Sequence, residues 1–173
     1  MMCPRCGENN LPGSDTCRHC QCDLTALDRP EPLDRVEQSL MGDTVAVLKP
    51  RVPVVVGPGA TVAAAVRMLL DEDVGALLIV DGSGKLAGIF SERDLLTKVA
   101  GSPKPLEKLA VESFMTPRPE CVTAGDTLAF ALHKMDVGGY RHLPVVADGK
   151  PTGILSVRDL IRHLTDICRE KKR

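Results

Sequence analysis

Short apolar runs and amphipathic segments alternate along the chain from about residue 45 onward. Residues 54–56 and 77–80 are compact runs rich in β-branched and leucine side chains, which predict buried strands. Between them lies a predicted helix that Thr61 can cap, and its apolar face carries Val62, Val66 and Leu69. A second strand joined by a Gly-containing turn follows, and another helix is expected just after Ser91. This order predicts a small β-α-β-β-α unit.

The same order returns in the second half of the chain. Ser91 aligns with Ser156, an offset of 65 residues, and Thr61 aligns with Thr127, an offset of 66. The second copy has predicted strands at 121–123 and 143–146 and a helix whose apolar face carries Leu128, Leu132 and Met135. One copy is too small to bury both faces of its sheet. The repeat therefore predicts an α/β (α+β) fold in which two copies pack by pseudo-twofold symmetry.

Changes in composition divide the chain into four parts. The expected boundaries are residues 1–27 for a cysteine-rich head, 28–44 for a linker, 45–105 for the first copy and 106–170 for the second. Pro30 and Pro32 interrupt the pattern and mark the linker. Apolar residues at helical spacing predict a short helix over 33–41, leading into the first copy.

Five of the seven cysteines fall within the first 22 residues, and four of these form two Cys-x-x-Cys pairs: Cys3, Cys6, Cys17 and Cys20. Thiolates at this spacing can converge on one tetrahedral ion, and four thiolates suit zinc or iron. Cys22 can compete with Cys20 as the fourth ligand, and His19 is a more remote substitute. A dithiol redox switch would explain one pair but not two.

The first 24 residues resemble the short zinc-ribbon head found on many bacterial proteins. Gly7 follows the first pair as in that pattern, whereas Gln21 and Cys22 stand where a glycine usually follows the second. The resemblance implies structural zinc, and so few apolar residues mean that the metal would supply most of the folding energy. All four ligands would be used, so we expect a contact surface for another protein rather than a catalytic centre.

Charge and hydropathy narrow the function classes. The formal net charge of −1 provides no long-range attraction to nucleic acid, and the basic run at 169–173 is expected to be a solvated terminus. No stretch approaches the roughly 20 apolar residues of a membrane span, so no membrane partner is expected. We expect a cytoplasmic, reducing setting, in which cysteine clusters bind metal more often than they form disulfides.

Three features of the repeat together resemble the tandem CBS (cystathionine-β-synthase) domain pair, or Bateman module, over residues 45–168. They are Gly-Ile-x-Ser-x-x-Asp in both copies, the Met-Thr-Pro triplet at 115–117, and the segment 140–146. The resemblance implies a non-enzymatic regulatory protein that binds an adenosyl nucleotide such as AMP, ADP or ATP. It also implies a homodimer through the helical faces near Val66 and Leu132, and an unidentified protein partner.

The Ser-x-x-Asp motif has two interpretations. The pairs Ser91/Asp94 and Ser156/Asp159 can be capping boxes that only satisfy free N–H groups at a helix start. However, both copies also place an arginine within the motif, Arg93 and Arg158. A cation in the first turn faces the positive end of the helix dipole. A bound anion would resolve this conflict, and each motif lies at a strand end, where α/β units usually bind ligands.

In CBS pairs the motif aspartate binds the two ribose hydroxyls, so the resemblance gives this role to Asp94 and Asp159, with the motif serines beside the sugar and phosphate. Each cleft combines the motif of one copy with strand residues of the other. The residues facing Asp94 would be Thr123, Arg141 and His142. Those facing Asp159 would be Gly57, Gly75 and Ala76, which offer neither a hydroxyl nor a charge. We therefore expect the nucleotide to bind first at the Asp94 cleft.

An enzyme and a ligand-free adaptor are the two other classes of function. The sequence gives no support to an enzyme, because it contains no Ser-His-Asp order, no P-loop and no open metal site. A ligand-free adaptor, in which head and repeat bind only proteins, stays open. Gly57 stands where the second copy has Thr123, and this departure from the family weakens the case for a ligand.

Overall fold

The computed structural model describes residues 1–11, 13–25 and 34–170. The chain forms two compact units, Met1–Asp34 and Arg35–Arg173, and each is described by itself. The proline-rich part of the predicted linker (28–32) and the last residues of the basic run (171–173) lie outside the described residues, as does Leu33 at the start of the predicted first helix.

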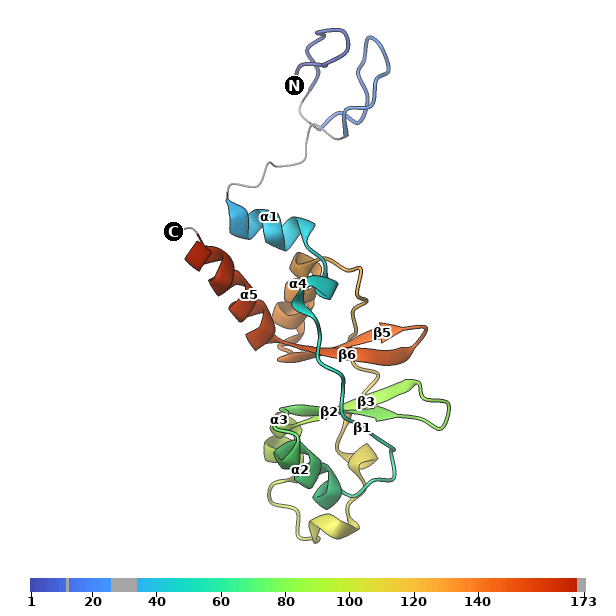
Figure 1. Ribbon diagram of the computed structural model, residues 1–173. Helices are drawn as coiled ribbons and strands as arrows, with labels where there is room; N and C mark the ends of the chain where they lie inside the picture. Colours follow the sequence, from blue (N-terminus) through green and yellow to red (C-terminus); the bar gives the residue numbers. More distant parts are fainter. Residues whose placement is uncertain (12, 26–33, 171–173) are drawn as a thin grey trace. The chain divides into compact units, whose positions relative to one another are not determined.

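The elements of the larger unit follow the predicted order closely. They are α1 (Arg35–Gly42), η2 (Val45–Leu48), β1 (Val55–Val56), α2 (Val62–Asp71), β2 (Ala76–Val80), β3 (Leu86–Ser91), α3 (Glu92–Asp94), η3 (Leu95–Val99), η4 (Leu106–Lys108), η5 (Val111–Ser113), β4 (Thr116–Pro117), α4 (Leu128–Gly138), β5 (His142–Ala147), β6 (Lys150–Ser156) and α5 (Val157–Glu170). The sheets are β1-β2-β3-β4 and β5-β6. They lie between helices α2 and α3 on one side and α1, α4 and α5 on the other (Figure 1).

Both predicted helix caps form. The Thr61 hydroxyl accepts from the Ala64 N–H at 3.1 Å, and the Thr127 hydroxyl accepts from the Phe130 N–H at 3.2 Å. Each cap satisfies an N–H group that the first helical turn leaves free. The buried positions that follow keep helical spacing in each copy: Val62, Ala65 and Leu69 in α2, and Leu128, Ala131 and Met135 in α4. The first strand of the second copy is reduced to a single parallel bridge between Val122 and Val145.

The segments that lead into the two copies are exchanged. Val45, at the start of the first copy, is fully buried in the core of the second, while Val111, near the start of the second copy, is fully buried in the core of the first. Backbone bridges hold both segments, with Arg51 opposite Ile154 and Thr116 opposite Ile89. Each core is therefore completed by the other copy's leading segment, so neither copy buries its core alone. The boundaries at 45 and 106 stay a prediction.

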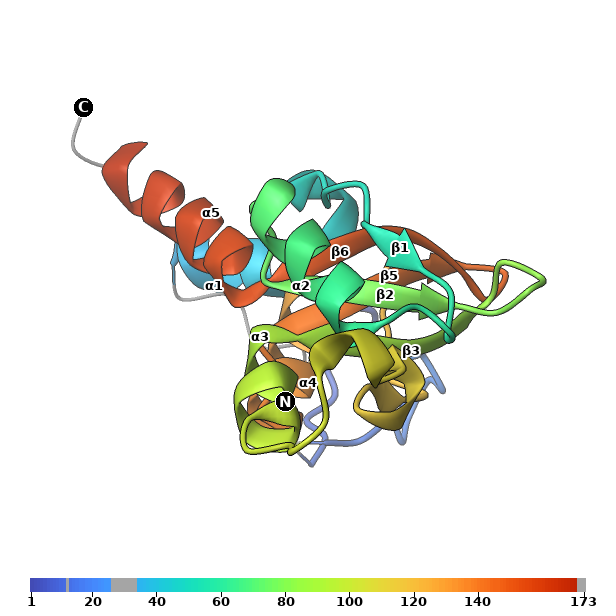
Figure 2. The ribbon, with the colours of Figure 1, turned by 90° about the horizontal axis from the view of Figure 1, so that it is seen from below.

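The helices that follow the two motifs differ in length. In the first copy, α3 passes into the π-helical turn η3, which ends at Val99. Gly101 and the nearby prolines at 103 and 105 then prevent a longer helix. In the second copy, α5 continues to Glu170 and projects beyond the sheets (Figure 2). There it packs beside α1, where the Ser39 hydroxyl lies 2.9 Å from His163 Nε2.

Candidate ligand cleft and metal site

A cavity of about 470 Å³ lies where the two copies meet, within the size range of small-molecule sites. Both copies line it. The first contributes Gly75, Ser91, Glu92, Arg93, Asp94 and Lys98, and the second contributes Thr116, Glu120, Gly139, Tyr140, Arg141 and His142. The structure therefore brings together five of the six residues predicted for the first cleft. Thr123 does not line the cavity; its backbone N–H donates to Asp126 instead.

Asp94 is the buried carboxylate of this cavity, with 7% of the residue exposed. Its Oδ2 accepts from the Ser91 backbone N–H at 2.9 Å and from the Ser91 hydroxyl at 2.6 Å. The Asp94 N–H lies 3.4 Å from the same hydroxyl oxygen, which completes a capping box. The capping interpretation is thus correct for this pair, and Oδ1 takes no part in the cap.

The second oxygen of Asp94 has partners of its own. Lys98 Nζ lies 2.6 Å from Oδ1, and the Thr116 hydroxyl lies 3.3 Å from it. Lys98 Nζ also donates to Thr116 Oγ1 at 3.1 Å. Burial raises the pKa of Asp94, but the bonds from Lys98 and Ser91 outweigh it and hold the pKa below its usual value. The carboxylate is therefore charged at neutral pH.

The charge of Arg93 was expected to be offset by a bound anion, but a carbonyl group of the protein lies beside it. Its Nη1 donates to the Gly139 carbonyl at 2.9 Å, just past the end of α4. The free carbonyls at a helix C-terminus carry partial negative charge and favour a cation. The protein itself thus resolves part of the conflict that was ascribed to a missing anion, and Arg93 still lines the cavity.

His142 lies between the two copies. A Cβ on Gly75 would stand 3.0 Å from His142 Cε1, so the bare glycine backbone makes room for the imidazole. Burial lowers the pKa of His142, against the carboxylates of Glu92 and Asp159, which raise it. The ring is neutral at pH 7 and can donate or accept a hydrogen bond, whereas Arg141 beside it supplies a positive charge.

Ser156 and Asp159 form the same cap as Ser91 and Asp94, but the side chains around Asp159 differ. Asp159 Oδ2 accepts from the Ser156 N–H at 2.9 Å and from the Ser156 hydroxyl at 2.6 Å. Its Oδ1 meets Arg162 Nη1 only at 3.5 Å. Arg158 is exposed. Gly75, which was expected beside Asp159, lines the Asp94 cavity, and Ala76 is buried between the sheets.

Sequence reasoning missed Lys98 and Thr116. Lys98 stands four residues after Asp94 on a predicted helix, a spacing that places the two side chains on one face. Thr116 belongs to the Met-Thr-Pro triplet, a family feature that does not by itself indicate which side chain reaches the cavity. Its position beside Asp94 depends on the exchange of leading segments, and no local signal reveals that exchange.

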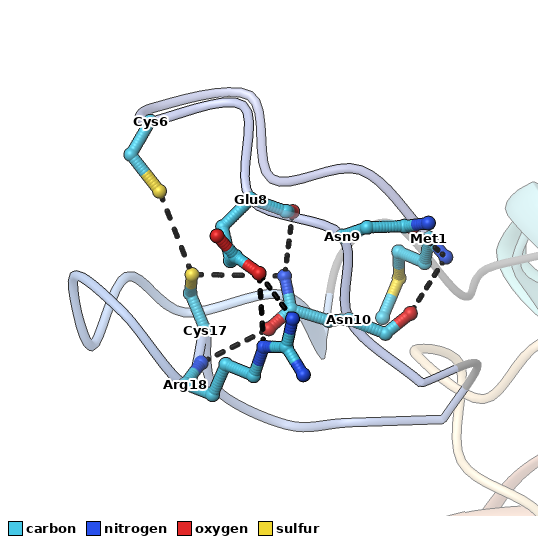
Figure 3. Close-up of polar contacts among 7 residues, drawn as sticks. All are labelled: Met1, Cys6, Glu8, Asn9, Asn10, Cys17 and Arg18. Carbon is cyan, nitrogen blue, oxygen red and sulfur yellow. Dashed lines mark hydrogen bonds and ion pairs between the residues drawn. The ribbon is translucent and has the colours of Figure 1, made fainter.

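The four predicted cysteines of the smaller unit converge. Their sulfurs lie within 4.8 Å of one another. The Cys3 and Cys20 sulfurs are 3.7 Å apart. Those of Cys6 and Cys17, which face each other in Figure 3, are 3.6 Å apart. Tetrahedral thiolates about 2.3 Å from one metal would stand about 3.8 Å apart. The residues present therefore fit a four-thiolate metal site, and the cluster contains Cys20 and not Cys22.

The two halves of the metal site have matching backbones. The Gly7 N–H donates to the Cys3 carbonyl and the Gln21 N–H donates to the Cys17 carbonyl, both at 2.9 Å. Gly7 has φ of 73° and Gln21 has φ of 58°. The second turn thus adopts the left-handed conformation that favours glycine, with a glutamine in place. Cys22 is half-buried, and its sulfur lies 3.6 Å from the Asp23 carbonyl.

Asn10 is the buried polar residue beside these sulfurs, with 6% exposed. Its amide nitrogen lies 3.0 Å from the Glu8 carbonyl and 3.6 Å from Cys17 Sγ, while its oxygen accepts from the Arg18 N–H at 2.9 Å (Figure 3). The Cys20 N–H lowers the pKa of the Cys17 thiol, opposed by burial and assisted by the His19 N–H and the Asn10 amide. Asn10 therefore ties the two halves together and favours the thiolate at Cys17.

A serine, a histidine and an aspartate also meet between α1 and α5. The Ser39 hydroxyl donates to Asp43 Oδ2 at 2.5 Å and lies 2.9 Å from His163 Nε2. A nucleophilic triad needs the carboxylate to orient the imidazole, which then activates the serine. Here the same ring nitrogen, His163 Nε2, lies 2.9 Å from the Ser39 hydroxyl and 3.6 Å from Asp43 Oδ2, so the imidazole does not connect the carboxylate to the serine through its two nitrogens as in a relay.

Among residues 1–11, 13–25 and 34–170, none of the helices combines the length and the apolar character that a membrane span requires.

The CBS domain family model matches residues 48–101 and 111–166. An uncharacterized 17.7 kDa protein from Acidianus ambivalens is 36% identical over 114 residues, which is 65% of this chain and 68% of the relative. A CBS domain-containing protein from Arabidopsis thaliana, CBSCBSPB5, is 34% identical over 113 residues, but the match spans only 20% of that protein.

Solved structures show the same pair of repeats. A CBS-domain containing protein from Agrobacterium tumefaciens matches with a TM-score of 0.63 and 31% identity, covering 69% of this chain and 94% of its own. CBSX2 in complex with AMP matches with a TM-score of 0.60 and 31% identity, covering 74% of this chain and 100% of its own. These matches confirm the predicted α+β class with two packed repeats.

Proposed function

Because the chain belongs to the CBS domain family, we propose that it is a regulatory protein that binds AMP, ADP or ATP in the Asp94 cavity and signals to a protein partner. One observation carries the proposal. A buried carboxylate lines a cavity between the repeats together with three cations, Arg93, Lys98 and Arg141. A carboxylate accepts from two vicinal hydroxyls at once, and the cations suit a phosphate.

The relatives support this assignment. CBSX2 was solved with AMP, and CBS domains in general regulate rather than catalyse. The Ser39 cluster has the wrong order for a nucleophile, and the four cysteines leave a metal no open position. A regulatory role without catalysis is therefore the proposal for the chain as a whole.

Calorimetry with AMP, ADP and ATP tests the proposal and the choice of cleft. Asp94→Ala should abolish binding, while Asp159→Ala should leave at least one site of nearly unchanged affinity. Both variants remove the same cap, so Asp159→Ala controls for the loss of helix stability. Equal loss from both changes would contradict the preference for the first cleft, and no heat from the unchanged protein would contradict nucleotide binding.

We also propose that the metal of the head is structural zinc, which its sulfur separations fit. Metal analysis should give one zinc per chain, and replacement by Co²⁺ should give the absorption bands of a tetrahedral four-thiolate site. Iron would instead give a coloured protein as isolated. Removal of the metal should unfold the head, because metal binding supplies its folding energy, and should weaken any contact with the protein partner.

One observation favours the ligand-free adaptor as a second candidate. Both oxygens of Asp94 already have protein donors, so the carboxylate has a structural role without any ligand. A thermal-shift screen separates the two candidates, because a ligand that binds only the folded state raises the melting temperature. A sensor shifts with AMP, ADP or ATP, whereas an adaptor shifts with none of them.

We propose a homodimer through α2 and α4. Leu70 and Val137 are each 74% exposed on these helices, and Leu132 on α4 is 36% exposed. Exposed apolar side chains on a helix can be buried by a second copy. Light scattering should give twice the chain mass, and Val137→Glu should give the mass of a single chain.

A further inference from the structure

The two oxygens of Asp94 are not equally available to a ligand. Oδ2 accepts twice from Ser91, and these bonds also form the start of α3, so they cannot be released without loss of the cap. Oδ1 accepts from Lys98 and Thr116. A carboxylate offers about four lone-pair sites, and four donors already occupy them. A ligand hydroxyl can reach this carboxylate only if a donor leaves Oδ1.

Lys98 is the donor that can leave. Its side chain is 40% exposed and lines the cavity, and it ends a flexible four-carbon stem. Thr116 is fixed on β4, which pairs with β3 through Ile89. If the Lys98 ammonium group leaves Oδ1 and is only hydrated, the free energy of the ion pair is lost. A second anion close by would replace that ion pair.

The second cleft lacks this arrangement. At the offset of 65 residues, the counterpart of Lys98 is His163, which bonds to Ser39 on α1. The counterpart of Thr116 is Arg51, because each stands opposite the equivalent isoleucine, Ile89 or Ile154. Among the described residues, Asp159 Oδ1 meets only Arg162, at 3.5 Å. Of the two motif aspartates, Asp94 alone has a lysine within ion-pair distance of Oδ1, the outer oxygen, which takes no part in the cap.

We propose that Lys98 is a displaceable counter-ion, which leaves Asp94 when a ribose hydroxyl arrives and then binds the phosphate of the same ligand. This inference rests on the proposed nucleotide function and adds a selectivity to it. A nucleotide replaces the lost ion pair with a new one, so the exchange costs little. A neutral nucleoside breaks the ion pair and replaces it with none. Lys98 therefore makes the first cleft select phosphorylated adenosyl ligands over adenosine.

The test compares AMP with adenosine by calorimetry on the full, zinc-loaded chain. The unchanged protein should prefer AMP. Lys98→Gln should weaken AMP binding about tenfold, as expected for one lost charge-assisted bond, and should leave adenosine binding equal or tighter. Lys104→Gln is the matched control, because Lys104 is exposed and lies outside the cavity, and it should change neither affinity.

The outcomes separate this inference from the proposed function. Equal weakening of both ligands by Lys98→Gln would show a merely structural role and overturn the exchange while leaving nucleotide binding intact. If the unchanged protein binds neither ligand, the proposed function fails and the exchange fails with it. A ligand-free readout checks the premise. The Asp94 carboxyl pKa, measured by NMR, should rise in Lys98→Gln, and an unchanged pKa would overturn the proposal whatever the ligands do.

Discussion

The different surroundings of the two motif aspartates predict different costs of the same substitution. Asp94→Asn and Asp159→Asn both remove a charge at a helix start and both retain an oxygen for the donors of the neighbouring serine. These shared effects cancel when the two variants are compared. What differs is the outer oxygen, which meets Lys98 at 2.6 Å at Asp94 and an exposed arginine at 3.5 Å at Asp159.

The size of the difference follows from these contacts. A hydrogen bond to a charged group contributes about 1.5–3 kcal/mol, but Lys98 is 40% exposed and can turn to water, so the upper part of that range is not reached. The Arg162 contact is a surface pair that contributes about 0–1 kcal/mol. We therefore expect Asp94→Asn to lower the free energy of unfolding by about 1–2 kcal/mol more than Asp159→Asn.

Urea unfolding followed by circular dichroism measures this difference, since the chain has no tryptophan to report by fluorescence. Zinc should be kept saturating so that the head does not contribute a separate transition. A double-mutant cycle with Lys98→Gln assigns the coupling energy to the pair. Equal costs for the two asparagine variants, or a coupling energy of zero, would refute the reasoning from Oδ1.

Three further predictions concern the head and the dependence on pH. Gln21→Gly should stabilise the metal-loaded head by about 1 kcal/mol, because position 21 has φ of 58°; a lower melting temperature of the head would contradict this. Asn10→Ala should weaken Co²⁺ binding and shift the thiolate absorption bands, since it removes the amide beside Cys17, and unchanged spectra would contradict it. Because the folded-state pKa of Asp94 is depressed, its stabilisation is present above the unfolded value of about 3.9 and is lost as the pH falls through the folded pKa. Urea titrations from pH 6 to pH 3 should show a smaller loss of stability in Lys98→Gln.

Local patterns were sufficient to predict the repeat and most of its elements. Thr61 and Thr127 begin helices as expected, and the first apolar runs form strands, because capping and side-chain periodicity act within a few residues. The convergence of the cysteines could also be predicted, since the short spacing within each Cys-x-x-Cys pair keeps its two sulfurs close together. Exchange of the leading segments was not readable, because Val45 and Val111 are buried by residues far away in the sequence.

The residues of the cleft were predicted only in part, because some of them are brought together by contacts between residues far apart in the sequence. Ser91, Arg93 and Asp94 belong to one local motif, whereas Arg141, His142 and Thr123 were placed by the resemblance to CBS pairs. The structure brings Arg141 and His142 to the cavity, but not Thr123. Arg93 illustrates the limit of local electrostatics, because the end of α4 that offsets its charge lies 46 residues further along the chain.

The central claim is that the cavity between the repeats binds an adenosyl nucleotide through Asp94. A crystal structure of the full chain grown with saturating AMP tests it most directly. We predict density for the nucleotide with a ribose hydroxyl within hydrogen-bond distance of Asp94 Oδ1 and with Lys98 turned toward the phosphate. An empty cavity with Lys98 still on Asp94 would contradict the account.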